Sequence, residues 1–129
     1  MDKFKVLVVD DEEDFLETIV KRLQTRKIDV TGVDSGIKAL SIIDDRDFDV
    51  VILDVKMPGL DGIETLREIK KKKPLLEVIM LTGHASVESG IQGMQLGAFD
   101  YVMKPVALDE LLEKMRQAYE RKLISEGKA

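Results

Sequence analysis

The feature that most constrains this 129-residue chain is a short apolar run at residues 50–53 (VVIL), which ends in Asp54 and leads at once into a loop sequence. Apolar residues without polar alternation predict a strand that is buried on both faces, as in parallel sheets covered by helices. The Pro58-Gly59 and Asp61-Gly62 pairs that follow predict a loop. We therefore expect Asp54 at the carboxyl end of a central strand, where open α/β sheets bind ligands.

Four other apolar runs predict further strands. They lie at residues 4–9, 28–33, 78–81 and 101–103. Three of them lead directly into side chains that can do chemistry, namely Asp10 with Asp11, Thr82, and Lys104. The pattern seen at Asp54 is therefore repeated along the chain.

Between the strands, apolar residues recur with the spacing of amphipathic helices. These stretches lie at residues 15–23, 37–43, 63–69, 87–94 and 108–119. Gly90 and Gly93 make the fourth of these helices intrinsically weak. Strands that alternate with helices predict an α/β fold with a doubly wound parallel sheet and helices on both faces. We expect a single domain over residues 1–129, with a core at about 3–121 and a polar tail at 122–129.

The composition limits the classes of partner. The formal net charge is −5 and 35% of the residues are charged, which argues against non-specific nucleic-acid binding because that depends on Lys and Arg neutralising phosphates. The basic run at residues 70–73 stands at a predicted helix end, where it favours the helix dipole and stays solvated. Cysteine is absent, and no apolar run reaches the length of a membrane span. We therefore expect a cytoplasmic protein that contacts neither membrane nor nucleic acid directly.

If the strands are parallel, Asp10, Asp11, Asp54, Thr82 and Lys104 meet at one edge of the sheet. Three carboxylates in one pocket repel one another, which raises their pKa values or requires a cation. Oxygen ligands of this kind suit Mg2+, which accepts a few carboxylates together with waters and phosphate oxygens. A simpler alternative is that Asp10 and Asp11 only cap the helix that follows them.

Taken in order, Asp10-Asp11, Asp54 with its MPGLDG loop, Thr82 and Lys104-Pro105 resemble the receiver domain of bacterial two-component response regulators. The resemblance extends over about residues 3–121. The phrases LDVKMPGLDG and GAFDYVMKP are most similar to receivers of the nitrogen-regulation type. The resemblance implies a flavodoxin-like fold of five parallel strands in the order 2-1-3-4-5, flanked by five helices.

The resemblance also implies a role for each residue of the group. Asp54 is the phosphoacceptor, a known covalent role for a carboxylate. Mg2+ is held by Asp11 and Asp54 directly, by Asp10 through water, and by the backbone carbonyl of Lys56. Lys104 pairs with an oxygen of the phosphoryl group, whose developing charge Mg2+ also neutralises.

Four further positions complete the implied machinery. Thr82 donates a hydrogen bond to the phosphoryl group, and Tyr101 is the switch aromatic that occupies the space Thr82 vacates. The peptide bond before Pro105 resembles the cis bond of the family. Lys56 and His84 flank the path of the attacking water and are expected to tune the lifetime of the phosphoryl group.

The implied function is a phosphorylation-activated signalling switch of a two-component system. A sensor histidine kinase or phosphotransfer protein donates the phosphoryl group. The change alters the face formed by the fourth helix, fifth strand and fifth helix, which binds a downstream protein or output domain and can support a phosphorylation-dependent dimer. No enzyme activity is expected beyond Mg2+-dependent self-phosphorylation and autodephosphorylation.

Three alternatives fit parts of the sequence. A Mg2+-dependent phosphohydrolase with an aspartyl nucleophile usually carries that residue on the first strand and a cap domain over it, and this chain has Asp10-Asp11-Glu12 there but no cap. A flavodoxin-like cofactor binder is disfavoured because the turn DDEE after the first strand repels phosphate. A pseudo-receiver scaffold that works without phosphorylation is the third alternative, and the complete set of five residues argues against it.

Overall fold

The structure, a computed structural model, describes residues 5–56, 59, 61–83 and 87–127. Strands and helices alternate along the chain, as the sequence predicts. The strands are β1 (Lys5–Val9), β2 (Asp29–Val33), β3 (Val50–Asp54), β4 (Glu77–Thr82) and β5 (Asp100–Met103). The helices are α1 (Glu13–Thr25), α2 (Gly36–Asp45), α3 (Gly62–Lys72), α4 (Val87–Gln95) and α5 (Leu108–Ser125).

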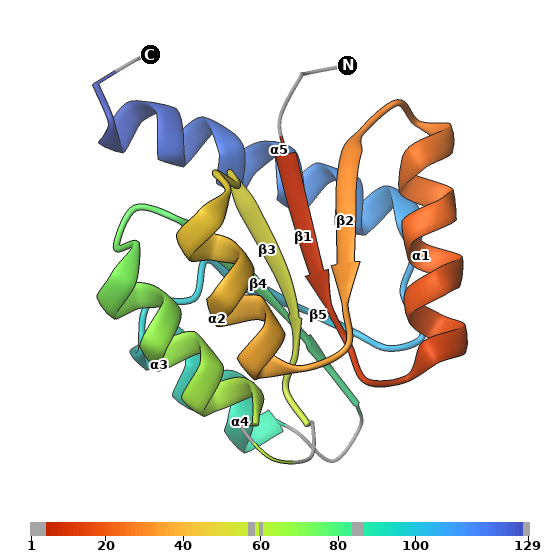
Figure 1. Cartoon of the computed structure of the whole chain (residues 1–129), viewed down its shortest axis with the longest axis horizontal. Helices are drawn as coiled ribbons and strands as arrows, with labels where there is room; N and C mark the ends of the chain where they lie inside the picture. The colour runs from red at the N-terminus through yellow and green to blue at the C-terminus, as the bar shows by residue number, and fades with distance from the viewer. Residues whose placement is uncertain (1–4, 57–58, 60, 84–86, 128–129) are drawn as a thin grey trace.

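The five strands form one sheet in the order β2-β1-β3-β4-β5. Every pair of neighbours is parallel, so the carboxyl ends of the strands share one edge, which is the lower edge in Figure 1. In the same view α2 and α3 lie in front of the sheet, and α5 crosses behind it (Figure 1). The predicted fold class and strand order are therefore confirmed.

Alternate residues of the central strands face two separate cores. Leu7 and Val9 of β1 pack with the helices in front of the sheet, whereas Val6 and Val8 pack with α1 and α5. Every residue of β3 is buried. Burial on both faces explains why the run at 50–53 shows no polar alternation. Each fully buried Val or Leu contributes about 1.5–3 kcal/mol to folding, which fixes the register of the central strand.

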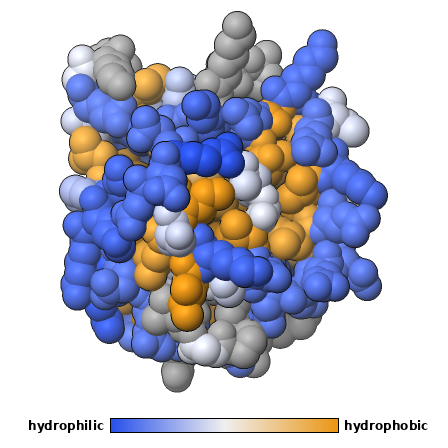
Figure 2. Space-filling model, in the orientation of Figure 1, coloured by the Kyte–Doolittle hydropathy of each residue, from blue (hydrophilic) through white to orange (hydrophobic). Residues whose placement is uncertain are grey.

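The apolar stripe of α2 differs from the one expected. The buried residues of this helix include Gly36, Ala39 and Ile43, whereas Ile37 is 69% exposed. Its exposure places Ile37 on the solvent side of α2. Figure 2 shows apolar residues gathered in the middle of this face of the molecule and hydrophilic residues around them.

Within the described part of the chain, the helices are all too short or too polar to cross a bilayer.

The last helix is longer than the sequence indicates. It runs to Ser125, so residues 122–125 belong to the helix and not to a polar tail. Lys122 pairs with Asp49 at 3.3 Å, which ties this last part of α5 to the loop before β3. The preceding residue, Arg121, hydrogen-bonds both carboxylate oxygens of the buried Glu77. These pairs give the polar end of α5 a partner in the folded domain.

The basic run at the end of α3 is also less solvated than expected. Lys70 is half-buried, and its Nζ donates hydrogen bonds to the backbone carbonyls of Pro74 and Leu76 at 2.8 and 3.1 Å. Burial lowers the pKa of Lys70. Lys72 is exposed and pairs with Asp44 of α2 at 3.1 Å. The run therefore closes the α3–β4 connection instead of forming a free basic patch.

Candidate functional site

The candidate site lies at the carboxyl edge of the sheet. Asp54 is the last residue of β3, and Asp10 directly follows β1. Because Val9 of β1 is paired with Leu53 of β3, the residues after them emerge side by side. Lys104 follows β5 and reaches the same place. The structure therefore brings together three of the residues that the sequence singled out, from three different strands.

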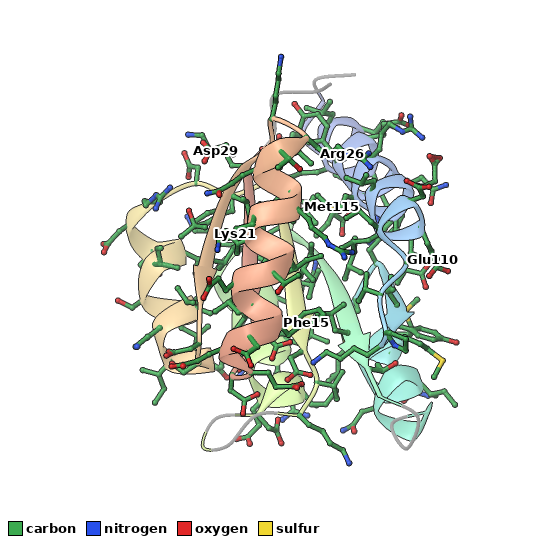
Figure 3. All side chains as sticks on the ribbon, turned by 90° about the vertical axis from the view of Figure 1, so that its right-hand side faces the viewer. Phe15, Lys21, Arg26, Asp29, Glu110 and Met115 are labelled. Atoms are coloured by element: carbon green, nitrogen blue, oxygen red, sulfur yellow. The ribbon has the colours of Figure 1, made fainter. Side chains whose placement is uncertain are left out.

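The ammonium group of Lys104 stands between three carboxylates. Its Nζ lies 2.7 Å from Oε1 of Glu12, 2.9 Å from Oδ2 of Asp10 and 3.7 Å from Oδ1 of Asp54. The side chain also passes over the ring of Phe15, with Nζ 4.5 Å from the ring centre. Figure 3 shows Phe15 near the lower end of α1, on the side of the helix that faces α5. The cation is thus enclosed by acids on one side and an aromatic ring on another.

A backbone hydrogen bond holds the buried Asp10 in place. Oδ1 of Asp10 accepts it from the N–H of Glu12, the residue before α1, at 2.9 Å, and Glu12 itself makes no side-chain cap bond. The side chain of Asp10 is completely buried, and Asp54 is 6% exposed. Asp10 therefore bonds the backbone at the start of α1, as the capping alternative expects in part. Its other oxygen, Oδ2, lies next to the ammonium of Lys104.

The electrostatics of the site depend on burial first and on neighbouring charge second. Burial and then the charge of Asp10 raise the pKa of Asp54 to about 7, although Lys104 and the backbone N–H of Lys56 lower it in part. Burial also raises the pKa of Asp10, against the opposing effect of Lys104. Burial alone would lower the pKa of Lys104, but the hydrogen bonds to Glu12 and Asp10 outweigh it and raise that pKa. The site therefore holds more negative charge than one ammonium can neutralise.

Three carboxylates are close enough to share a metal ion. Oxygens of Asp10, Glu12 and Asp54 all lie within 4.8 Å of one another. Two of these acids are buried with raised pKa values, and a hard divalent cation with oxygen ligands would relieve their repulsion. The chemistry of the donor set therefore fits Mg2+. Asp11 is half-buried and does not belong to this group of oxygens, although its charge contributes to the raised pKa of Asp54.

Thr82 and Tyr101 lie on the two strands that follow. Thr82 ends β4 and is 3% exposed, and its carbonyl accepts a hydrogen bond from the backbone N–H of Lys104 at 2.8 Å. Tyr101 of β5 is 44% exposed and pairs with Met80. Its ring is 3.9 Å from the position that a Cβ of Gly90 would take. The buried threonine and the exposed ring therefore stand on adjacent strands, next to the α4 helix.

The other predicted positions have mixed outcomes. The peptide bond between Lys104 and Pro105 is cis, as the resemblance implies. Lys56 is exposed beside Asp54. His84 lies outside the described residues, so its expected role in tuning stays a prediction.

Sequence reasoning missed the contact that Glu12 makes in the site and the cap that Asp61 provides for α3. Glu12 makes the shortest contact to Lys104, and the signal available for it was its place as the third acid of the run that begins at Asp10. Asp61 caps α3 by accepting a hydrogen bond from the N–H of Glu64 at 2.9 Å, and the residue after it, Gly62, donates its N–H to the carbonyl of Val55 at 2.9 Å. The acidic side chain before a glycine indicates such a cap.

A cavity of about 550 Å³ lies at the opposite edge of the sheet, away from these acids. It opens between the residues that precede the strands, among them Arg46, Phe48 and Leu76. Asp10, Glu12 and Asp54 do not line this cavity.

Comparison with known proteins gives consistent matches. The family model described as the response regulator receiver domain matches residues 6–116. Response regulator MprA of Mycobacterium sp. (strain KMS) is 37% identical over 123 residues, which cover 95% of this chain and 54% of MprA. The DNA-binding transcriptional regulator NtrC of Escherichia coli (strain K12) is 33% identical over 113 residues, which cover 88% of this chain and 24% of NtrC. The chain thus spans about half the length of MprA and about a quarter of NtrC.

Solved structures match over nearly the whole chain. A response regulator receiver domain protein from Clostridium thermocellum has a TM-score of 0.90 and 40% identity, and the match covers 94% of this chain and 98% of that one. The receiver domain of NtrX from Brucella abortus has a TM-score of 0.85 and 35% identity, with 89% and 98% covered. The similarity to NtrC and NtrX is consistent with the nitrogen-regulation type that the sequence resembles.

Proposed function

This chain belongs to the response regulator receiver domain family, and from that premise we propose that it accepts a phosphoryl group on Asp54 and thereby changes the face around α4, β5 and α5. Receiver domains of response regulators act as phosphorylation-activated switches in two-component systems. The observation that carries the proposal is the pairing of a buried, strand-end Asp54 with the ammonium of Lys104, 3.7 Å away. The other carboxylates of the site support it.

We propose the following chemistry for the site. A carboxylate oxygen of Asp54 attacks the phosphorus of a phosphohistidine donor, so that a phosphorus–oxygen bond forms while the phosphorus–nitrogen bond breaks. The leaving imidazole keeps the electron pair and takes up a proton. Lys104 attracts the oxygens of the transferred group, and the hydroxyl of Thr82 donates a hydrogen bond to one of them.

The acids of the site have a different task. Asp10 and Asp54, with Asp11 and the backbone carbonyl of Lys56 as the resemblance implies, would hold Mg2+. When bound, Mg2+ neutralises charge that develops on the oxygens of the transferred group. Asp10 is suited to this because it is completely buried and its Oδ2 accepts no well-directed hydrogen bond within the described structure.

The proposed output face carries exposed apolar side chains. Ile91 and Met94 of α4 are 56% and 40% exposed, and Tyr101 and Met103 of β5 are 44% and 40% exposed. Apolar residues that gather on one face favour a protein partner. We propose that this face binds a downstream protein, an output domain or a second phosphorylated copy, and that a histidine kinase or phosphotransfer protein in the cytoplasm is the donor.

Membership of the receiver family does not favour the alternative functions. A phosphohydrolase of this kind usually carries its nucleophile on the first strand, whereas Asp54 ends the third strand, β3. A pseudo-receiver scaffold has no need for the acids and the lysine to converge. We therefore propose no catalytic activity beyond self-phosphorylation and autodephosphorylation.

The proposed function predicts a response to beryllofluoride, which mimics a phosphoryl group on a carboxylate. In two-dimensional NMR, beryllofluoride with magnesium should shift the amide signals of Thr82, Tyr101 and α4. The Asp54→Asn variant should show no such shifts, because an amide does not coordinate beryllium as a carboxylate does. The proposal fails if the unchanged chain does not respond.

Magnesium binding should depend on pH near neutrality. The pKa of Asp54 is about 7, so a proton competes with the cation for this carboxylate. As the pH falls from about 8 to 6, the dissociation constant for magnesium should rise, approaching tenfold per pH unit below 7. Isothermal titration at several pH values measures this dependence. In Asp54→Asn it should be clearly shallower, and an equally steep dependence there would show that another group takes up the proton.

A further inference from the structure

One contact of the site has no place in the proposed chemistry, namely the ion pair between Lys104 and Glu12. We propose that Glu12 is a positioning residue that restrains Lys104 in the unphosphorylated chain, so that a phosphoryl group on Asp54 must compete with Glu12 for the ammonium. The inference rests on the proposed function of Asp54. It assigns Glu12 the task of setting how readily the switch turns on.

The distances support this assignment. Nζ of Lys104 is in hydrogen-bond range of Glu12 at 2.7 Å and of Asp10 at 2.9 Å, but at 3.7 Å it is beyond that range from Asp54. The ammonium is therefore held toward α1 and not toward the phosphoacceptor. One of the three donors of Lys104 is hydrogen-bonded to Glu12, and the ion pair with Asp10 holds the ammonium on the same side before any phosphoryl group arrives.

Burial decides which partner can leave. The side chain of Asp10 is completely buried, whereas that of Glu12 is 64% exposed. Glu12 can therefore turn into water at little cost, and Asp10 cannot. A phosphoryl group adds negative charge next to Asp54, and one carboxylate oxygen of Asp54 lies within 4.8 Å of one of Glu12. Repulsion between the two anions then favours release of Glu12 and leaves Lys104 to the phosphoryl oxygens.

The expected size of the effect follows from the exposure of Glu12. Its side chain is 64% exposed, and breaking an ion pair with such an exposed partner changes an equilibrium constant by up to about fivefold. At saturating magnesium, Glu12→Gln should therefore bind beryllofluoride about two- to fivefold more tightly than the unchanged chain. Glu12 lies on the surface at the start of α1 and has no side-chain cap bond, so the variant should fold normally.

Two further variants separate the contact from the charge. Glu12→Asp keeps the negative charge but is one methylene shorter, so it withdraws the carboxylate from Lys104 and should tighten beryllofluoride binding like Glu12→Gln. Glu13→Gln removes an exposed charge from the next position and should leave binding unchanged. The gain in Glu12→Gln should shrink in about 1 M salt, which screens exposed pairs. NMR titration measures all three dissociation constants.

Several results would overturn the inference. If Glu12→Asp binds like the unchanged chain while Glu12→Gln binds more tightly, general charge and not the contact is responsible. If Glu12→Gln binds beryllofluoride more weakly, Glu12 assists the reaction or holds the metal. The pair is also visible without beryllofluoride, since both Glu12 variants should shift the side-chain signals of Lys104. If those signals move but the unchanged chain does not bind beryllofluoride, the ion pair between Lys104 and Glu12 exists and the proposed function has failed.

Discussion

Replacing Asp54 with Asn should abolish phosphoryl transfer to the chain and, at the same time, stabilise the fold at pH 8. The loss of transfer should be complete, because the side-chain amide is not a nucleophile toward phosphorus. Mass spectrometry after incubation with phosphoramidate and magnesium measures it. A phosphorylated Asp54→Asn variant would mean that another group accepts the phosphoryl.

The gain in stability has a separate cause. Without metal, the pKa of Asp54 is about 7 in the folded chain, against about 3.9 for an ordinary aspartate in the unfolded chain. The folded chain therefore holds this proton more tightly, and the stability that the proton provides is lost as the pH rises from about 4 to 7. The full difference corresponds to about 4 kcal/mol at pH 8, and relaxation of the site reduces it, so we expect a gain of about 1–3 kcal/mol for Asn.

Urea unfolding without magnesium at pH 5 and pH 8 tests whether Asp54→Asn raises the free energy of unfolding as expected. The gain from Asp54→Asn should be large at pH 8 and small at pH 5, where the unchanged Asp54 is protonated. Asp47→Asn is a matched control, because Asp47 is an exposed acid at the other edge of the sheet. An equal gain at both pH values would contradict the raised pKa. Together the two outcomes would show a residue kept for chemistry at the expense of stability.

The sequence was sufficient to predict the parts of the site that lie at strand ends. A buried parallel strand needs an unbroken apolar run, so its last residue can be located to within one or two positions. Asp54 and Asp10 each follow such a run, whereas Lys104 follows the edge strand β5, in which only Val102 is buried. Asp54 and Asp10 converge because β1 and β3 are parallel neighbours, whereas Lys104 reaches them from β5, which lies two strands beyond β3.

Contacts between distant side chains could not be predicted in the same way. Glu12 and Lys104 are separated by 92 positions, and their contact depends on how α1 starts and how the chain leaves β5. Glu77 and Arg121 are 44 positions apart, and only the packing of α5 on β4 brings them together. Helical periodicity likewise gives the apolar face of α2 without showing that Ile37 lies outside it, because a stripe read from sequence has no fixed edges.

Gly62, where the loop after Asp54 enters α3, has a packing role that its sequence context alone does not indicate. At Gly62, the first residue of α3, an added Cβ would lie 2.5 Å from Cα and 2.6 Å from the carbonyl oxygen of Val55, and would also meet the carbonyl oxygen of Asp54. All of these are backbone atoms of the segment that carries the phosphoacceptor. They cannot turn aside as a flexible side chain can.

Gly62→Ala should therefore lower the free energy of unfolding by about 3 kcal/mol or more, at the upper end of the cost of overpacking. The methyl group can be accommodated only if α3 moves away from the end of β3, which breaks the hydrogen bond from Gly62 N–H to Val55. Urea unfolding measures the loss. Gly83→Ala is the matched control, because no atom of the described residues lies within 4 Å of a Cβ at that position, and it should be nearly neutral.

The same substitution should also weaken the site where the chain remains folded. Moving α3 away from β3 displaces the backbone at Asp54, whose distance to Lys104 is set by that backbone. Phosphorylation by phosphoramidate should then be slower in Gly62→Ala than in Gly83→Ala at a temperature where both are folded. If Gly62→Ala unfolds at the same urea concentration as Gly83→Ala, the helix start adjusts without strain and the close approach of α3 to the phosphoacceptor strand is not required.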